Sequence, residues 1–186
     1  KNNTVQSNKK WGIYLTDGAS GTIIGNLIGD ANLTDSVLGN TGPGIQLSSG
    51  AVFDVVNNVI ALNSGAGIAI SNAGDNNVIK ENTIIKNQYG IATYPSFIAN
   101  GLSIFNNVIK EQTGYAILGQ SSTEIALNGN LISNNDTEGD GRGIQLSGPA
   151  KVVNNTIVGH DELAIAVFGS GSVSCHACVR AVCMSS

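Results

Sequence analysis

The most charged stretch of the sequence, "NNDTEGDGRG" at residues 134–143, gathers carboxylates in one loop. Asp136 and Asp140 lie in it, and His160 and Asp161 follow about 20 residues later, roughly one repeat further on. A carboxylate beside an imidazole can act as a general acid or base, and carboxylate oxygens are also the ligands that Ca²⁺ takes. The sequence therefore predicts these four residues as catalytic candidates. Ca²⁺ binding and a merely solvated polar loop are the alternatives.

A second set of residues could bind a ligand without reacting with it. Tyr89, Tyr115 and Arg142 each stand two positions before an Ile, at similar spacing along the chain. Aromatic rings bury large flat surfaces, and a guanidinium pairs with carboxylates. We predict that these three residues contact substrate, with Tyr94 on the same side. The alternative is an aromatic stack that only shields a loop from water.

The three Cys residues all lie in the C-terminal segment "SGSVSCHACVRAVCMSS". Cys175, His176, Cys178 and Cys183 could supply four zinc ligands, but their spacing matches no familiar zinc motif. We therefore assign no metal site here and expect loose thiols in a tail.

An internal repeat must position all of these residues. Gly-Ile or Ala-Ile pairs and Asn-x-Ile steps each recur with a period near 24 residues, and both place one long insertion within residues 29–43. The Asn positions are Asn3, Asn26, Asn58, Asn82, Asn107, Asn130 and Asn155. Two columns that agree on the period indicate a repeated structural unit.

Alternation of apolar residues predicts strands. Ile68 and Ile70 flank Ala69, for example, which is the period of two typical of a strand. Each repeat holds three such segments and no hairpin signal, so each strand is expected to pair in parallel with its copy in the next coil, about 4.8 Å away. The predicted fold is an all-β parallel solenoid of about seven coils over residues 1–168, followed by an irregular tail or cap at 169–186.

The Asn column predicts an asparagine ladder at a sharp turn. Asn tolerates the left-handed backbone region, and stacked side-chain amides can hydrogen-bond from coil to coil. A second column contains Asn8, Asn63, Asn87, Gln112, Asn135 and His160, with Ala31 interrupting it. The Gly before each Ile is expected to admit a tight bend.

This pattern resembles the right-handed parallel β-helix of pectate-lyase-like and periplasmic NosD-like proteins, over about residues 2–168. The resemblance, with the crossover preference, implies a right-handed coil. It also implies a secreted, periplasmic or cell-surface protein that binds or processes a polysaccharide on the outward face of the first strand. The outward residues there are Tyr14, Gln46, Ala69, Ala92, Leu118, Gln145 and Ala166, which include no paired carboxylates.

The resemblance does not extend to a complete catalytic motif. The chain contains no Gly-His-Gly and no Asp-Pro-His, and its two Arg, Arg142 and Arg180, cannot form the Arg pair of pectate lyases. The sequence therefore leaves open whether the protein is a lyase, hydrolase or epimerase. The alternative is a non-catalytic solenoid scaffold or interaction module, such as a fragment of a larger surface or secreted protein.

Composition argues against two classes of partner, nucleic acids and membranes. The net charge of −4 argues against a nucleic-acid partner, and no apolar run approaches the roughly 18 residues of a membrane span. The chain begins in mid-coil, so we expect end-on self-association at an open solenoid end. Ca²⁺ is the one cofactor that the sequence suggests.

Overall fold

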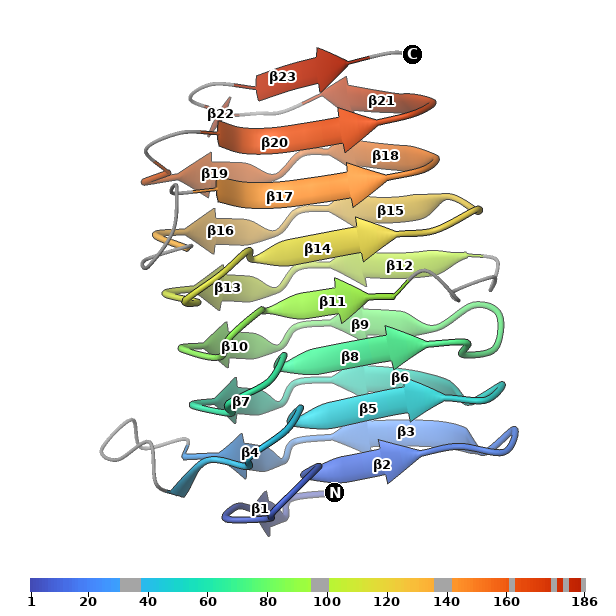
Figure 1. Ribbon diagram of the computed structural model, residues 1–186, viewed down its shortest axis with the longest axis vertical. Coiled ribbons are helices and arrows are strands. Elements are labelled where there is room, and N and C mark those ends of the chain that lie inside the picture. The colour runs from blue at the N-terminus through green and yellow to red at the C-terminus, as the bar shows by residue number, and fades with distance from the viewer. Residues whose placement is uncertain are drawn as a thin grey trace.

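The computed structural model describes residues 1–30, 38–94, 101–135, 142–160, 163–174, 177–178 and 181–184. These residues form an all-β parallel solenoid, which confirms the predicted fold class (Figure 1). Three parallel sheets run the length of the solenoid and are called here sheets A, B and C.

Each coil contributes one strand to each sheet. Sheet B holds the first strands: β2 (Ile13–Leu15), β5 (Ile45–Ser48), β8 (Ile68–Ser71), β11 (Ile91–Thr93), β14 (Ile117–Gln120), β17 (Arg142–Ser147), β20 (Leu163–Phe168) and β23 (Ala181–Met184). Sheet C holds the second strands: β3 (Ser20–Ile24), β6 (Val52–Val56), β9 (Val78–Lys80), β12 (Leu102–Phe105), β15 (Ile125–Asn128), β18 (Ala150–Val153) and β21 (Gly171–Ser174). Sheet A holds the third strands: β1 (Thr4–Val5), β4 (Leu27–Gly29), β7 (Val59–Ala61), β10 (Thr83–Ile85), β13 (Val108–Lys110), β16 (Leu131–Ser133), β19 (Thr156–Val158) and β22 (Ala177–Cys178).

Strands of successive coils pair in parallel and in register. Ile68 lies opposite Ile91, and Ile91 lies opposite Ile117. The predicted direct superposition of coils is therefore confirmed, and the count of about seven coils approximately matches. Equivalent residues of neighbouring repeats are spatial neighbours, although about 24 positions separate them in the chain.

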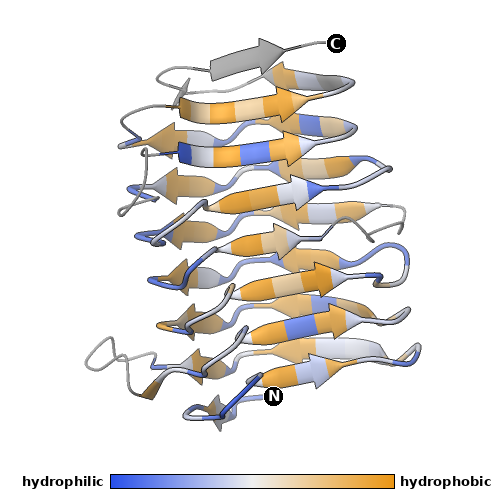
Figure 2. Ribbon diagram, in the orientation of Figure 1, coloured by the Kyte–Doolittle hydropathy of each residue, from blue (hydrophilic) through white to orange (hydrophobic). Residues whose placement is uncertain are grey.

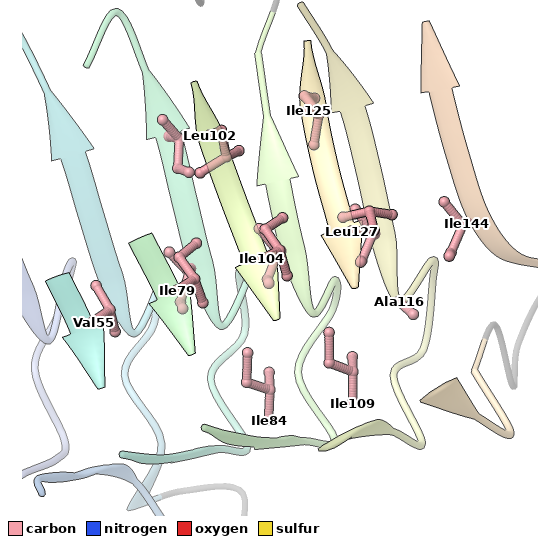
Figure 3. Close-up of a cluster of buried hydrophobic side chains, with 14 of the residues drawn as sticks. Val55, Ile79, Ile84, Leu102, Ile104, Ile109, Ala116, Ile125, Leu127 and Ile144 are labelled. Atoms are coloured by element: carbon pink, nitrogen blue, oxygen red, sulfur yellow. The ribbon is translucent and has the colours of Figure 1, made fainter. Parts of the chain in front are cut away.

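The interior is a set of stacked aliphatic columns. Most inward residues of the described strands are apolar, with Thr93 as a buried polar exception, and orange bands recur along the strands in Figure 2. In sheet C, Ile79, Ile104 and Leu127 are 0% exposed and occupy one column, which Figure 3 shows side by side. Burying a side chain of this size contributes about 1.5–3 kcal/mol, so the columns contribute to the cohesion between coils.

The first Asn column forms the predicted ladder between sheets C and A. The Asn82 amide Nδ2 donates to Asn107 Oδ1 at 3.0 Å, and Asn107 Nδ2 donates to Asn130 Oδ1 at 3.0 Å. The main-chain N–H of Asn82 also donates to Asn107 Oδ1, at 3.0 Å. Each buried side chain thus satisfies backbone as well as side-chain groups. The same bond joins Asn3 to Asn26, Asn26 to Asn58, Asn58 to Asn82 and Asn130 to Asn155.

The left-handed residue of this turn is not the ladder Asn, and that part of the prediction is wrong. The positive φ belongs to the preceding residue, such as Glu81 (φ 59°) or Asn106 (φ 56°). The chain turns at this residue, and the turn directs the next side chain inward. The ladder Asn is therefore selected for its hydrogen bonds and not for its backbone conformation.

A second ladder lines the turn between sheets A and B, and one residue of it was missed. Asn8 Nδ2 donates to Asn40 Oδ1 at 2.8 Å, and Asn40 Nδ2 donates to Asn63 Oδ1 at 2.7 Å. The prediction that Ala31 interrupts this column is wrong, because Asn40 continues it; Ala31 itself lies outside the described residues. The insertion within residues 29–43 places the ladder residue, Asn40, further along the chain than three residues after Ile28, where the repeat predicts it.

The backbone bends at the Gly before the Ile, as at Gly67, which agrees with the prediction, and this Gly also has a steric role. Gly67 does not have a positive φ. A Cβ on Gly67 would lie 2.7 Å from Ile84 Cγ2 and 2.9 Å from the Gly90 carbonyl oxygen. The position is therefore small because successive coils approach closely there.

The predicted boundary at residue 168 stays a prediction. The described backbone beyond it, in β21, β22 and β23, pairs in parallel with β18, β19 and β20.

We expect Asn107→Leu to lower the free energy of unfolding by about 1–3 kcal/mol, because the Asn82 N–H and the Ile79 carbonyl oxygen would each lose a buried partner. Denaturant unfolding followed by circular dichroism measures this change. Asn106→Gly is the matched control in the same turn, and it should change stability by less than about 1 kcal/mol because Gly accepts positive φ. Equal effects of the two substitutions would contradict a structural role for the ladder.

Candidate functional site

The outer face of sheet B is the candidate functional surface. Its strands β2 to β20 lie one above another as a continuous face (Figure 1). Several of its outward residues are nevertheless buried: Gln46, Ala69, Ala92 and Ala166. Ala66, Ala69 and Ala92 form a small apolar cluster, and the Tyr89 side chain packs against it. The middle of the face therefore consists of small Ala side chains, against which the Tyr89 ring packs.

Tyr89, Tyr115 and Arg142 form a row along this face, as their spacing indicated. The Tyr89 and Tyr115 rings are stacked, with centroids 6.5 Å apart and planes 17° apart. Arg142 Nη1 donates a 3.0 Å hydrogen bond to the Tyr115 hydroxyl oxygen. All three side chains are partly exposed. The aromatic–Arg row, as we call these three residues, is therefore a rigid surface that solvent can reach.

Gly114 leaves room for the row. A Cβ on Gly114 would lie 2.7 Å from Cε1 of Tyr89. This requirement was missed, although the Gly-Tyr pair at 114–115 was visible in the sequence. The close approach fixes the Tyr89 ring against the next coil.

Tyr94 extends the aromatic surface beyond the end of β11. Its side chain is 41% exposed. Partial burial raises the pKa of the Tyr94 hydroxyl above its ordinary value, and the nearby Tyr89 hydroxyl raises it further. Tyr94 therefore remains a neutral hydrogen-bond donor over the physiological pH range, on the side of the row where the sequence placed it.

A shallow pocket of about 360 Å³ lies beside the row on the turns that lead into sheet B. Ser64, Lys86, Gln88 and Thr113 contribute its polar lining, and Leu62 contributes an apolar part. Gln88 directly precedes Tyr89, so the pocket and the aromatic surface share the same coils. Hydroxyl, amide and ammonium groups in one concavity can bind a polar ligand.

The predicted acid–base residues are only partly described. Asp136, Asp140 and Asp161 lie outside the described residues, so their catalytic role stays a prediction. His160 is 9% exposed and is the last residue of the second ladder within the described part of the chain, with its Nε2 3.4 Å from the main-chain N of Asn135. An N–H donor facing Nε2 requires that this nitrogen accept. The geometry gives the ring a place in the ladder, and a catalytic role for it also stays a prediction.

Within the part of the chain that the structure describes, no cluster of three or more His, Cys, Asp or Glu side chains could hold a metal ion. The same residues include no helix long and apolar enough to cross a membrane.

Residues 1–157 match the family model described as the right handed beta helix region. The chain belongs to the right-handed beta helix family. Neither a comparison with curated proteins nor one with solved structures found a match. Membership in this family establishes a beta helix repeat protein, and the function must be argued from the surface of this particular beta helix.

We expect His160→Asn to keep or raise stability, because an amide can accept from Asn135 as the other ladder residues do. His160→Leu should lower the free energy of unfolding by about 1–3 kcal/mol, because a buried N–H would lose its acceptor. Chemical denaturation of both variants measures this. A large loss of stability in His160→Asn would show that the imidazole is required for more than the ladder.

We expect millimolar Ca²⁺ to raise the melting temperature if the loop carboxylates bind it. A ligand at 100 times its dissociation constant stabilises a fold by about 2.7 kcal/mol. The double variant Asp136→Asn/Asp140→Asn should remove the shift, and Mg²⁺ at the same concentration is the control ion. An unchanged melting temperature of the unmodified protein in Ca²⁺ would rule out the cation site.

Proposed function

We propose that this beta helix protein binds a polysaccharide along the outer face of sheet B. The observation that carries the proposal is the row of two stacked, partly exposed Tyr rings and an Arg on three successive coils. Sugar rings present apolar C–H faces that pack on aromatic rings, and their hydroxyl groups need hydrogen-bond partners at the edges. The aromatic–Arg row and the adjoining pocket offer both kinds of group.

The positive charges of the surface support an acidic or mixed polysaccharide. Arg142 lies against Tyr115 at one end of the row, and Lys86 lines the pocket at the other. The Lys86 ammonium is 3.7 Å from Glu111, which is also 3.4 Å from Lys110. Exposed pairs of this kind are worth about 0–1 kcal/mol, so a sugar carboxylate could displace Glu111 at little cost.

The direction of the row favours a polymer over a single sugar. Equivalent positions repeat about every 4.8 Å along the solenoid axis, so a ligand that follows the row meets a similar environment at successive coils. Catalytic processing of the bound chain is a further step, which depends on Asp136, Asp140, His160 and Asp161 and rests on the sequence alone. A secreted, periplasmic or cell-surface location would suit such a ligand.

We expect Tyr115→Ala to weaken polysaccharide binding about tenfold, because loss of the ring and of its hydrogen bond to Arg142 should together cost about 1.4 kcal/mol. A glycan array with neutral and acidic polysaccharides identifies the ligand, and isothermal titration calorimetry compares the variants. Tyr115→Phe keeps the ring but loses the bond to Arg142, so it should retain stacking and lose part of the affinity.

Leu131→Ala is the control for this experiment. Leu131 is 42% exposed and lies in β16 on sheet A, away from the proposed binding face. This variant should bind as the unmodified protein does. The proposal fails if no polysaccharide binds, or if Tyr115→Ala and Leu131→Ala bind equally well; a scaffold without carbohydrate affinity would then be the better interpretation.

A further inference from the structure

A second aromatic group lies on the same face, in the coil of β2. The Trp11 and Tyr14 rings are stacked, with centroids 4.3 Å apart and planes 14° apart. The Lys10 ammonium lies 3.9 Å from the centroid of the Trp11 ring. Neither the stack nor the cation–π contact was anticipated from the sequence, because each depends on side-chain rotamers at a bend and not on the repeat.

The arrangement leaves one aromatic face open. Tyr14 covers one face of Trp11 at contact distance, and the Lys10 ammonium must therefore lie over the other. Within the described part of the chain, Tyr14 stacks on no ring other than Trp11, and the residue is 45% exposed. Because the Tyr14 ring is already stacked on Trp11, its conformational freedom is small. A ligand that stacks on Tyr14 would therefore lose little affinity to the ordering of this side chain.

Tyr14 lies on the same face as the aromatic–Arg row, in a neighbouring column. Tyr14 pairs with Gln46, Gln46 with Ala69, and Ala69 with Ala92, and Ala92 stands three residues after Tyr89. The strands β2, β5, β8 and β11 are successive rungs of this face (Figure 1). Three steps of about 4.8 Å separate β2 from β11 by about 14 Å, which a short stretch of an extended polymer can span.

The interval between the two aromatic groups contains a polar network beside the apolar Ala cluster. Gln46 Nε2 donates to the Ser48 hydroxyl at 3.1 Å and to the Ser71 hydroxyl at 3.0 Å. Ser48 and Ser71 share a hydrogen bond of 3.0 Å. Ser71 is partly exposed, whereas Gln46 and Ser48 are buried, so this network offers the Ser71 hydroxyl to a ligand that crosses β5 and β8.

We propose that Tyr14 is a second sugar-binding position, and that one polysaccharide chain spans it and the aromatic–Arg row. This inference rests on the proposed function and extends it by fixing the path and the minimum length of the ligand. Aromatic rings at both ends with hydroxyl and amide groups between them match a polyhydroxylated chain better than an apolar partner surface. Two linked contacts strengthen binding through effective concentration, provided that the chain reaches both.

The test compares ligand lengths. Oligogalacturonates and cello-oligosaccharides, as disaccharides and as long oligomers, are titrated calorimetrically into the unmodified protein and Tyr14→Ala. We expect Tyr14→Ala to weaken binding of the long oligomer about tenfold and to leave disaccharide affinity unchanged. Leu27→Ala is the control, because Leu27 is 41% exposed in β4 but lies on sheet A; it should bind like the unmodified protein.

The single Trp of the chain supplies an independent readout. Because Trp11 is stacked on Tyr14, a long oligomer on Tyr14 should change its fluorescence, whereas a disaccharide bound at Tyr89 and Tyr115 should not. If long oligomers bind calorimetrically but Trp11 fluorescence and the Tyr14→Ala affinity do not change, the second position is wrong and the proposed function survives. If no oligomer binds by either method, both proposals fall.

Discussion

The hydrogen bonding of buried side-chain amides is the constraint on which the rest of this structure depends. An unpaired amide inside the solenoid would cost about 1–3 kcal/mol, and each ladder residue avoids that cost only if the next coil lies directly beneath it. The Asn82 amide, for example, reaches Asn107 and two main-chain carbonyl groups. Two such ladders, at two corners of the coil, hold successive coils in one register.

Because the register is fixed, residues at equivalent positions of successive repeats lie next to one another along the solenoid. Inside, Ile, Leu and Val stack into continuous apolar columns. Outside, packing constrains the residue type much less, so whatever repeats there becomes a feature of the surface. Tyr89 and Tyr115 meet because the coils that carry them are aligned, and Tyr89 also packs against Ala69 and Ala92. The interior thus determines the fold, while the exterior residues of sheet B determine what the protein can bind.

The sequence predicted the parts of the structure that follow from periodicity. The strands, the first ladder and the contact between Tyr89 and Tyr115 all belong to columns that repeat. Asn40 was missed because the insertion within residues 29–43 shifts it away from the position that the repeat predicts. The left-handed conformation was assigned to the ladder Asn and not to the residue before it, and the close approach at Gly67 was missed, because each depends on backbone geometry that a pattern of residue types does not contain. The Trp11–Tyr14 pair has no counterpart in other repeats, so no periodic argument could find it.

Hydrogen–deuterium exchange of the ladder amides tests the central claim most directly. The main-chain N–H groups of Asn82 and Asn107 donate to side-chain oxygens of the next coil and are not part of the strand pairing. If the ladders hold the coils in register, these two amides should exchange only through cooperative unfolding, as slowly as those of β10 and β13. Exchange at the rate of an unprotected loop, with the strands still protected, would show that the apolar columns hold the coils together without the ladders.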